Sequence, residues 1–404
     1  MPAGDAISRV VGFQKYRVDE VWKYRGWAAL FVKRKRPGYR CPGCGQQYVF
    51  YHDRKDRYLR DLSLGQFKSL LVVPQHRIDC DRCGRQRERL PFVREGARCT
   101  RRFEKWLFVL TRYMTVKAVS TLLCCDWGMV KDAEVRYIRG LLRKRDLSGI
   151  RRIGIDEVSE RSGHRYLTLV TDLDRRRVIW VGRNRDRAVL RRFFRWFGPE
   201  RSKRLKLAVI DMHDPYELEL RAQVPRAAII YDRFHVMKHM NGAVDLIRRR
   251  VQSQMTPEER RVIKNKRYLL LKAAESLKDK QRVTLDELLA ANREIATAYV
   301  LKEDFREWFK CRRPAEARSY LRDWIGKVND SGIPELLKFV ELLKRRRRGI
   351  RGYFRHRITN GLSEGFNNVV KTIKKMAYGF HDSHYFRLKI LRICGKLEET
   401  EKSI

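Results

Sequence analysis

Two aspartates stand directly at the ends of apolar runs, where Asp156 closes RIGID and Asp211 closes LAVID. A carboxylate placed after a buried strand is penalised by desolvation unless a cation or hydrogen bonds compensate. If the first and fourth strands of this region are neighbours in one sheet, the two side chains converge and form an oxygen-ligand site for Mg²⁺ or Mn²⁺. A pair of such ions supports in-line displacement at a phosphodiester. Taken alone, either aspartate could instead be a turn residue that ends a strand.

A third carboxylate would complete a two-metal site, and spacing alone does not choose it among the many glutamates. Glu364 has the best local argument, because one face of its expected helix continues with Asn367, Lys371, Lys374 and Lys375. Such a row of polar and ammonium groups could follow a phosphate backbone. The alternative is a solvated basic helix whose glutamate lies near the N-terminus, where the helix dipole favours it.

Four of the nine cysteines form two C-x-x-C-G knuckles, Cys41 to Cys44 and Cys80 to Cys83. Four thiolates are the ligand set of a tetrahedral structural Zn²⁺, and the trailing glycines allow the tight reversal. His52 and His76 could replace a ligand, but the cysteine set is already complete. A disulfide pair or redox chemistry is the alternative, and nothing in the sequence indicates an oxidising compartment. We expect the other five cysteines to be free thiols.

Short strands around the knuckles would be held together by the metal; we expect them at Trp27–Val32, Gln46–His52 and Ser69–Gln75. Three segments with helical periodicity follow, at Phe103–Tyr113, Val116–Cys124 and Met129–Leu142. A short helix, a turn with glycine and a longer basic helix describe a helix-turn-helix. The side chains that could face a DNA groove are Lys131, Arg136, Arg139 and Arg143. A small three-helix bundle with a solvated basic face would give the same pattern.

The carboxylates lie in a region that changes to strands from Arg152 onwards. Three apolar runs separated by polar turns predict an antiparallel meander, and a helix, a strand, a second helix and a strand follow it. This order predicts one mixed sheet flanked by helices. After Phe234 the sequence is helical for more than a hundred residues, and a final helix is expected to open near Asn360 and to reach about Met376.

The composition indicates which partner this chemistry acts on. The 404 residues include 92 Lys and Arg against 48 Asp and Glu, a formal net charge of +44, with 43% hydrophobic residues. The apolar content is that of a globular protein, so disorder throughout is excluded, and the charge indicates a polyanion such as nucleic acid. No apolar stretch is long enough to span a bilayer and no signal peptide is evident. We therefore expect a soluble, intracellular protein that binds nucleic acid and has no membrane partner.

These motifs together resemble the DDE transposases of the bacterial ISL-three insertion-sequence family. The resemblance rests on the two knuckles, the helix-turn-helix, IGIDE, VIDMHDPY, YDRFHV and NGLSEGFNNVVKTIKKMAYGF. It implies an RNase H-like core in which Asp156, Asp211 and Glu364 bind the catalytic metal, interrupted by an all-helical insertion. It also implies that Asp232 and His235 form a short Asp-x-x-His motif. His235 would orient active-site groups or contact DNA, and a core histidine is the alternative.

The predicted fold class is therefore multidomain α+β. We expect a zinc-binding domain at 1–95, a helix-turn-helix at 96–148, the RNase H-like core at 149–240 and 351–404, and the helical insertion at 241–350. The predicted function is that of a transposase, which binds terminal inverted repeats and catalyses metal-dependent strand cleavage and transfer. It would act as a homodimer or larger assembly on element and target DNA, and the resemblance implies a cytoplasmic, nucleoid-associated bacterial protein. The alternatives are a catalytically silent DNA-binding regulator and an RNase H-like nuclease.

Overall fold

A computed structural model describes the chain apart from residues 1–11, 14, 162–164 and 398–404. The described chain forms two compact units, one ending at Arg145 and the other beginning at Asp146. Within the described residues, no helix has the length and apolar character needed to cross a membrane.

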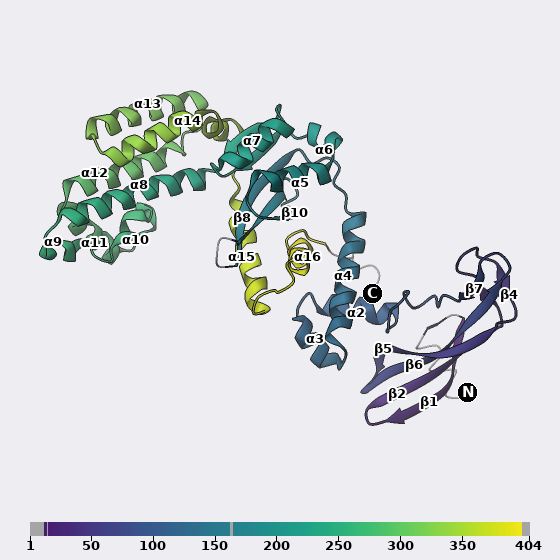
Figure 1. Cartoon of the computed structure of the whole chain (residues 1–404). Helices are drawn as coiled ribbons and strands as arrows, with labels where there is room; N and C mark the ends of the chain where they lie inside the picture. Colours follow the sequence, from purple (N-terminus) through teal and green to yellow (C-terminus); the bar gives the residue numbers. More distant parts are fainter. Residues whose placement is uncertain (1–11, 14, 162–164, 398–404) are drawn as a thin grey trace. The chain divides into compact units, whose positions relative to one another are not determined.

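The first unit opens with a five-stranded sheet in the order β1-β2-β6-β5, with β7 paired to β6 (Figure 1). Its strands are β1 (Tyr16–Tyr24), β2 (Trp27–Arg34), β5 (Asp53–Leu64), β6 (Phe67–Cys80) and β7 (Gly84–Arg87). One face of this sheet is apolar and packs Leu30, Leu59 and Leu71 against Leu90 and Val93. The expected strands Trp27–Val32 and Ser69–Gln75 are confirmed as parts of β2 and β6.

The expected strand Gln46–His52 is wrong over most of its length. Only β4 (Gln47–Tyr48) is a strand, and it pairs with β3 (Tyr39–Arg40) to form a small hairpin around the first knuckle. The rest of this run has no strand partner, and Phe50 is 87% exposed. The consecutive apolar residues Tyr48–Tyr51 therefore resembled a strand in a segment that joins the knuckle to β5. The strands β1 and β5, which are rich in charged residues, were not expected.

In the described part of the first unit, the sheet is followed by the helices α2 (Arg101–Leu110), α3 (Val116–Leu123) and α4 (Trp127–Lys144). The expected order of helices is confirmed. The last helix begins two residues before the expected start, because the Asp126 side chain caps it by accepting a hydrogen bond from the Met129 N–H at 3.0 Å.

The second unit is built on a five-stranded sheet in the order β10-β9-β8-β11-β12. Its strands are β8 (Arg152–Arg161), β9 (Arg165–Asp172), β10 (Arg177–Arg183), β11 (Leu207–Ile210) and β12 (Ala228–Tyr231). The antiparallel meander β8-β9-β10 is confirmed. The first and fourth strands, β8 and β11, are neighbours, which was the condition for the two aspartates to converge. The β8–β11 and β11–β12 pairs are parallel.

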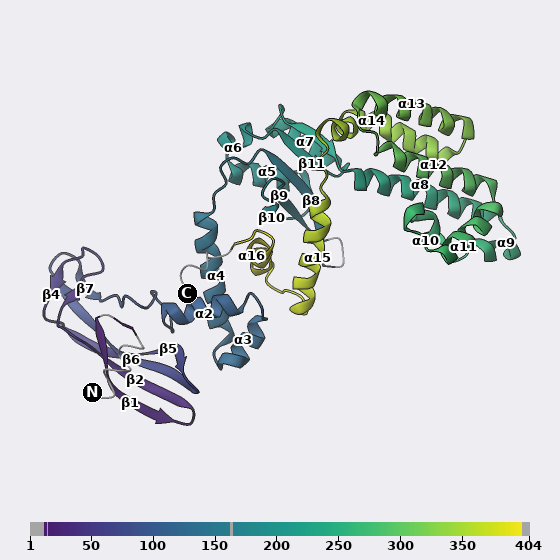
Figure 2. The same cartoon turned by 180° about the vertical axis from the view of Figure 1, so that it is seen from behind.

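Helices cover both faces of this sheet. The helices on one face are α5 (Arg187–Phe197) and α7 (Asp214–Gln223), with the short α6 (Pro199–Lys203) between them. Ile155 and Phe193 belong to the apolar core on that face. On the other face lie α15 (Gly361–Met376), which runs beside β8 in both views, and α16 (Ser383–Ile393) against β10 (Figure 2). There Val158 packs with Val370 and Phe386. The helix α16 was not expected, although Asp382 caps its start.

The predicted long helical segment is confirmed. Its helices are α8 (Arg233–Gln254), α9 (Pro257–Ile263), α10 (Arg267–Leu271), the 3-10 turn η1 (Ala274–Ser276), α11 (Asp279–Ala290), α12 (Arg293–Trp308), α13 (Pro314–Ser331) and α14 (Pro334–His356). The last helix packs against both α8 and β12. The contact with β12 is close, because a Cβ on Gly349 would lie 2.5 Å from the Tyr231 ring.

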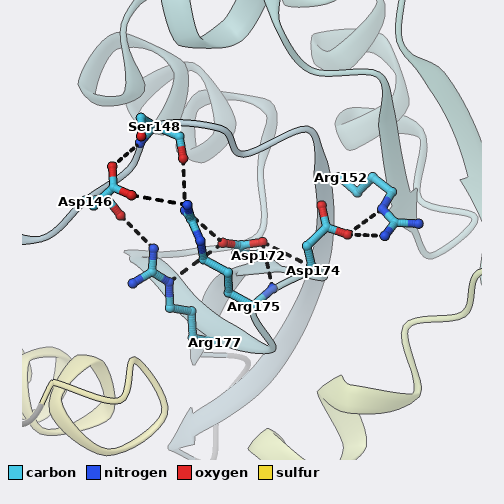
Figure 3. Close-up of polar contacts among 7 residues, drawn as sticks. All are labelled: Asp146, Ser148, Arg152, Asp172, Asp174, Arg175 and Arg177. Atoms are coloured by element: carbon cyan, nitrogen blue, oxygen red, sulfur yellow. Dashed lines mark hydrogen bonds and ion pairs between the residues drawn. The ribbon is translucent and has the colours of Figure 1, made fainter.

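Side chains of the turn between β9 and β10 bind residues 146–148, the segment at the start of the second unit that leads to β8 (Figure 3). The buried Asp172 shapes the turn, since its Oδ1 accepts the N–H groups of Asp174 and Arg175 at 3.1 and 3.2 Å. The guanidinium of Arg175 donates to the Ser148 carbonyl at 2.9 Å and to the Asp146 carboxylate at 3.1 Å. These bonds hold the approach to β8 against the sheet.

Candidate active site

The aspartates predicted from the two apolar runs lie level with each other, Asp156 on β8 and Asp211 directly after the adjacent parallel strand β11. Val209 of β11 is opposite Gly154 of β8, so Asp211 and Asp156 each follow two residues later in the same register. Asp156 is 7% exposed. Its Oδ1 accepts the Glu157 N–H at 2.7 Å, and its Oδ2 accepts the Asn367 side-chain amide at 2.9 Å.

His235 joins this pair from the first turn of α8. Asp232 directly follows β12 and caps the N-terminus of α8, where its side chain accepts the Phe234 N–H at 3.3 Å. His235 Nε2 then lies 2.7 Å from Asp211 Oδ1. One ligand atom from each of Asp156, Asp211 and His235 lies within 4.8 Å of the other two, a grouping that could hold a metal ion.

The electrostatics of the group favour a bound cation. Burial, followed by the charge of Asp211, raises the pKa of Asp156 to about 6. Burial lowers the pKa of His235, but its contact with Asp211 and the charges of the nearby aspartates outweigh that effect and leave the pKa above its ordinary value. A divalent cation with oxygen ligands would relieve the repulsion between these buried carboxylates. The residues present therefore fit a Mg²⁺ or Mn²⁺ site.

Glu364 lies in the first turn of α15 and is exposed. Its carboxylate is not in the group formed by Asp156, Asp211 and His235. The helix that carries it is nevertheless tied to the site, because Asn367, one turn further along, donates to Asp156. The sequence pattern had placed Asn367 on a phosphate-binding face, and the structure gives its amide a carboxylate partner instead.

The start of α15 is fixed by a second amide that sequence reasoning missed. Asn360 is buried, and its side chain donates to the Ile155 carbonyl on β8 at 3.2 Å. A Cβ on Gly154 would lie 2.3 Å from Asn360 Oδ1, so the glycine permits this close approach. The backbone N–H of Asn360 also hydrogen-bonds to Asp232. The Asn-Gly pair in NGLSEGFNN was visible in the sequence, but its long-range partners were not.

Glu157 lies on the other face of β8 from Asp156 and belongs to a separate polar cluster. Burial raises its pKa, and a hydrogen bond with Tyr216 opposes that effect. Arg185 and His213 lie 3.7 and 3.8 Å from its carboxylate. These groups support the sheet directly behind the acidic pair.

The expected DNA-facing side chains divide by environment. On α15, Lys371 and Lys375 are exposed and Lys374 is half-buried. On α4, Arg139 and Arg143 are exposed, and Lys131 lies over the Trp127 ring at 5.3 Å. Arg136 has a partner within the bundle, because it donates to the fully buried Glu104 at 2.6 Å.

The four knuckle cysteines converge as predicted. Their sulfurs lie within 4.8 Å of one another, and none is in a disulfide. Gly45 and Gly84, which follow the knuckles, have φ values of +80° and +66°, a conformation that favours glycine. His52 and His76 are engaged elsewhere, with Asp79 at 3.0 Å and Glu88 at 2.7 Å.

Comparisons with known proteins agree with this arrangement. Three family models match in order: a zinc finger of the transposases of IS204, IS1001, IS1096 and IS1165 over residues 37–83, a helix-turn-helix domain of transposase family ISL3 over 88–138, and the ISL3 DDE transposase model over 153–390. The transposase for insertion sequence element IS1001 of Bordetella parapertussis is 36% identical over 386 residues, 94% of this chain and 95% of that protein. The transposase for IS1557 of Mycobacterium tuberculosis is 28% identical over 401 residues, with 92% and 90% covered.

Proposed function

Because the chain belongs to the ISL3 family of DDE transposases, we propose that Asp156, Asp211 and Glu364 hold divalent metal ions at the site of DNA cleavage and strand transfer. The observation that supports this is the placement of Asp156 and Asp211 level on neighbouring strands, with ligand atoms within 4.8 Å. Glu364 is the candidate third ligand because its helix is bonded to the site through Asn367.

The bound ions, Mg²⁺ or Mn²⁺, would supply charge stabilisation at the scissile phosphate and lower the pKa of the attacking oxygen. The protein supplies the orientation. The Glu157 N–H and the Asn367 amide fix both oxygens of Asp156, and His235 holds Asp211. His235 therefore acts as a positioning residue in this proposal, and Asp232 links the starts of α8 and α15.

The reaction sequence follows from phosphoryl chemistry. Water attacks the phosphodiester at the element end, the P–O3′ bond breaks, and a free 3′-hydroxyl is left. That hydroxyl then attacks a phosphodiester of target DNA and displaces another 3′-oxygen. Both steps are displacements at phosphorus, so one carboxylate site can serve both without a covalent enzyme intermediate.

The surrounding architecture supports further parts of the proposal. The mixed sheet, interrupted between Asp232 and α15 by the helical segment, fits an RNase H-like core with an insertion, divided at 149–240, 241–350 and 351–404. The zinc domain and helix-turn-helix, at 1–95 and 96–148, would bind the terminal inverted repeats. Joining two element ends to target DNA calls for a dimer or larger assembly acting on the nucleoid.

The test is cleavage and strand transfer with end-containing DNA and Mg²⁺, using wild-type protein, Asp211→Asn and Glu364→Gln. We expect both variants to lose at least about 10³-fold in rate, since each removes a charge that stabilises the transition state. Asp323→Asn, an exposed position on α13, is the matched control and should keep wild-type activity. Undiminished cleavage by Asp211→Asn would overturn the metal-site assignment, and loss in Asp211→Asn alone would remove Glu364 from it.

A further inference from the structure

The sheet of the first unit carries an aromatic row on the face opposite its apolar core. Phe31, Val72 and Tyr58 lie level on β2, β6 and β5. Trp22 on β1 extends the row, with its ring centroid 4.8 Å from that of Phe31. Trp22 is 62% exposed and Tyr58 is 64% exposed. Two large ring surfaces therefore face solvent on an open sheet.

The row leads into a groove of about 420 Å³ on the same face. Val72 and Pro74 lie along β6 between Phe31 on β2 and Arg54 on β5. Three rings, those of Tyr39, Tyr51 and His76, cluster at the end near the zinc knuckles, with centroids 4.5 to 5.4 Å apart. The volume falls within the range of about 300–1,000 Å³ that is usual for ligand sites.

Basic side chains border the groove end of this surface, and the acidic Glu20 lies opposite Phe31 on β1. The basic run Lys33–Arg36 ends β2 and continues past it, and Lys33 and Arg34 line the groove with Arg54. Asp56 is the acidic residue in the lining. Arg34 is paired with Glu88, and Lys33 lies 2.5 Å from Asp19, while Lys35 and Arg36 are exposed. The surface combines stacking groups with a cationic rim, which suits a polyanion that carries flat rings.

We propose that this face binds an unpaired strand of DNA, with bases stacked on Trp22, Phe31 and Tyr58 and phosphates near the Lys33–Arg36 run. Duplex DNA keeps its base faces stacked on one another, so it cannot use the exposed rings. Unpaired bases do stack on aromatic side chains in cationic grooves. The proposal goes beyond the metal-site assignment and relies only on the family's action on DNA. It gives the enzyme a means of holding a strand that has separated at an element end.

The test measures binding rather than cleavage, so it is independent of the proposed metal site. Full-length, zinc-loaded protein without added Mg²⁺ is titrated into a labelled twelve-residue oligothymidylate and, separately, into a duplex that contains the element end. We expect Trp22→Ala and Tyr58→Ala each to weaken single-strand binding by about 5- to 100-fold, with duplex binding changed less than about twofold. Trp22→Phe and Tyr58→Phe, which keep a ring, should retain most of the affinity.

Tyr268→Ala is the matched control, because Tyr268 is 75% exposed on α10 in the other unit. It should bind both DNAs like wild type. Zinc content and circular dichroism establish that the variants are folded. Trp22 should also contribute quenching of tryptophan emission when the single strand binds, and Trp22→Phe should remove that contribution. Unchanged single-strand binding, equal losses for single strand and duplex, tighter binding to oligouridylate RNA, or a change only in oligomeric state would each overturn the proposal.

Discussion

Replacing Asp156 by Asn should stabilise the metal-free protein at neutral pH while abolishing its chemistry. In the folded protein, burial and the charge of Asp211 raise the pKa of Asp156 from 3.8 to about 6. An acid with a raised pKa in the folded state binds its proton more tightly when folded. Its ionisation therefore reduces stability as the pH rises from about 4 through 6, and the full penalty applies at pH 7.5.

The size of the effect follows from the shift. Each pH unit of pKa difference corresponds to about 1.4 kcal/mol, so the ionised Asp156 costs at most about 3 kcal/mol at pH 7.5 and about half of that at pH 5. An asparagine fits the same place. Its Oδ1 can accept the Glu157 N–H, and its amide can donate to Asn367 Oδ1, which is buried and has no hydrogen-bond partner. That requires only a flip of the Asn367 amide.

Scanning calorimetry of the full-length, zinc-loaded protein between pH 4.5 and 8, without added Mg²⁺, measures this effect. The transition of the second unit should be about 5–10 °C higher in Asp156→Asn at pH 7.5, and the difference should shrink towards pH 4.5. Millimolar Mg²⁺ should stabilise wild type and leave the variant unchanged. Asp323→Asn should behave like wild type throughout. A variant that melts at or below the wild-type temperature at pH 7.5 would refute the reasoning.

Three further predictions concern the supports of the two units. Gly154→Ala should destabilise the second unit by about 1–3 kcal/mol and reduce cleavage, because the added Cβ would collide with Asn360. Gly242→Ala, which has open space around it in α8, should be neutral or stabilising. Equal effects of the two substitutions in denaturant titrations would contradict the contact between Gly154 and Asn360. Arg175→Ala should lower the free energy of unfolding by about 1 kcal/mol and speed hydrogen exchange at residues 146–150. Arg176→Ala, at an exposed neighbouring position, is the matched control. Unchanged exchange in Arg175→Ala would show that Arg175 does not hold this segment. Cys80→Ser should lose zinc and increase hydrogen exchange at residues 37–52, while the second unit melts as in wild type. Retained zinc in this variant would exclude the four cysteines as the ligand set.

The sequence was sufficient to predict those features of the fold and site that depend on local residue patterns and on the order of elements along the chain. The apolar runs before Asp156 and Asp211 predicted two buried strands, and parallel pairing of those strands brought the carboxylates level. The knuckle spacing predicted the sulfur cluster for the same reason, since each C-x-x-C turn delivers two ligands together. These features depend on short segments whose geometry is nearly fixed.

Long-range polar contacts could not be predicted, because their partners are far apart in the chain. Asn367 and Asp156 are separated by 211 positions. Arg136 looked like a DNA contact until the helix packing placed Glu104 beside it. Arg346, within the basic run Lys344–Arg348, likewise donates to Glu217 on α7 at 2.6 Å, across 129 positions of the chain. The sequence gives the charge of a side chain, but only the fold shows whether that side chain is already paired with an acidic residue of the protein.

The helical segment between Asp232 and α15 leaves the sheet after β12 and returns the chain to the same sheet. Its first and last helices, α8 and α14, explain this return. The first helix, α8, starts at the Asp232 cap, and α14 packs along α8 and on β12, where Gly349 admits the Tyr231 ring. The chain is thereby returned next to β8, and Asn360 binds the Ile155 carbonyl and Asp232 at once. The placement of α15, which carries the proposed ligand Glu364, therefore depends on the helical segment, so we expect damage to α14 to impair the proposed metal site as damage to β8 would.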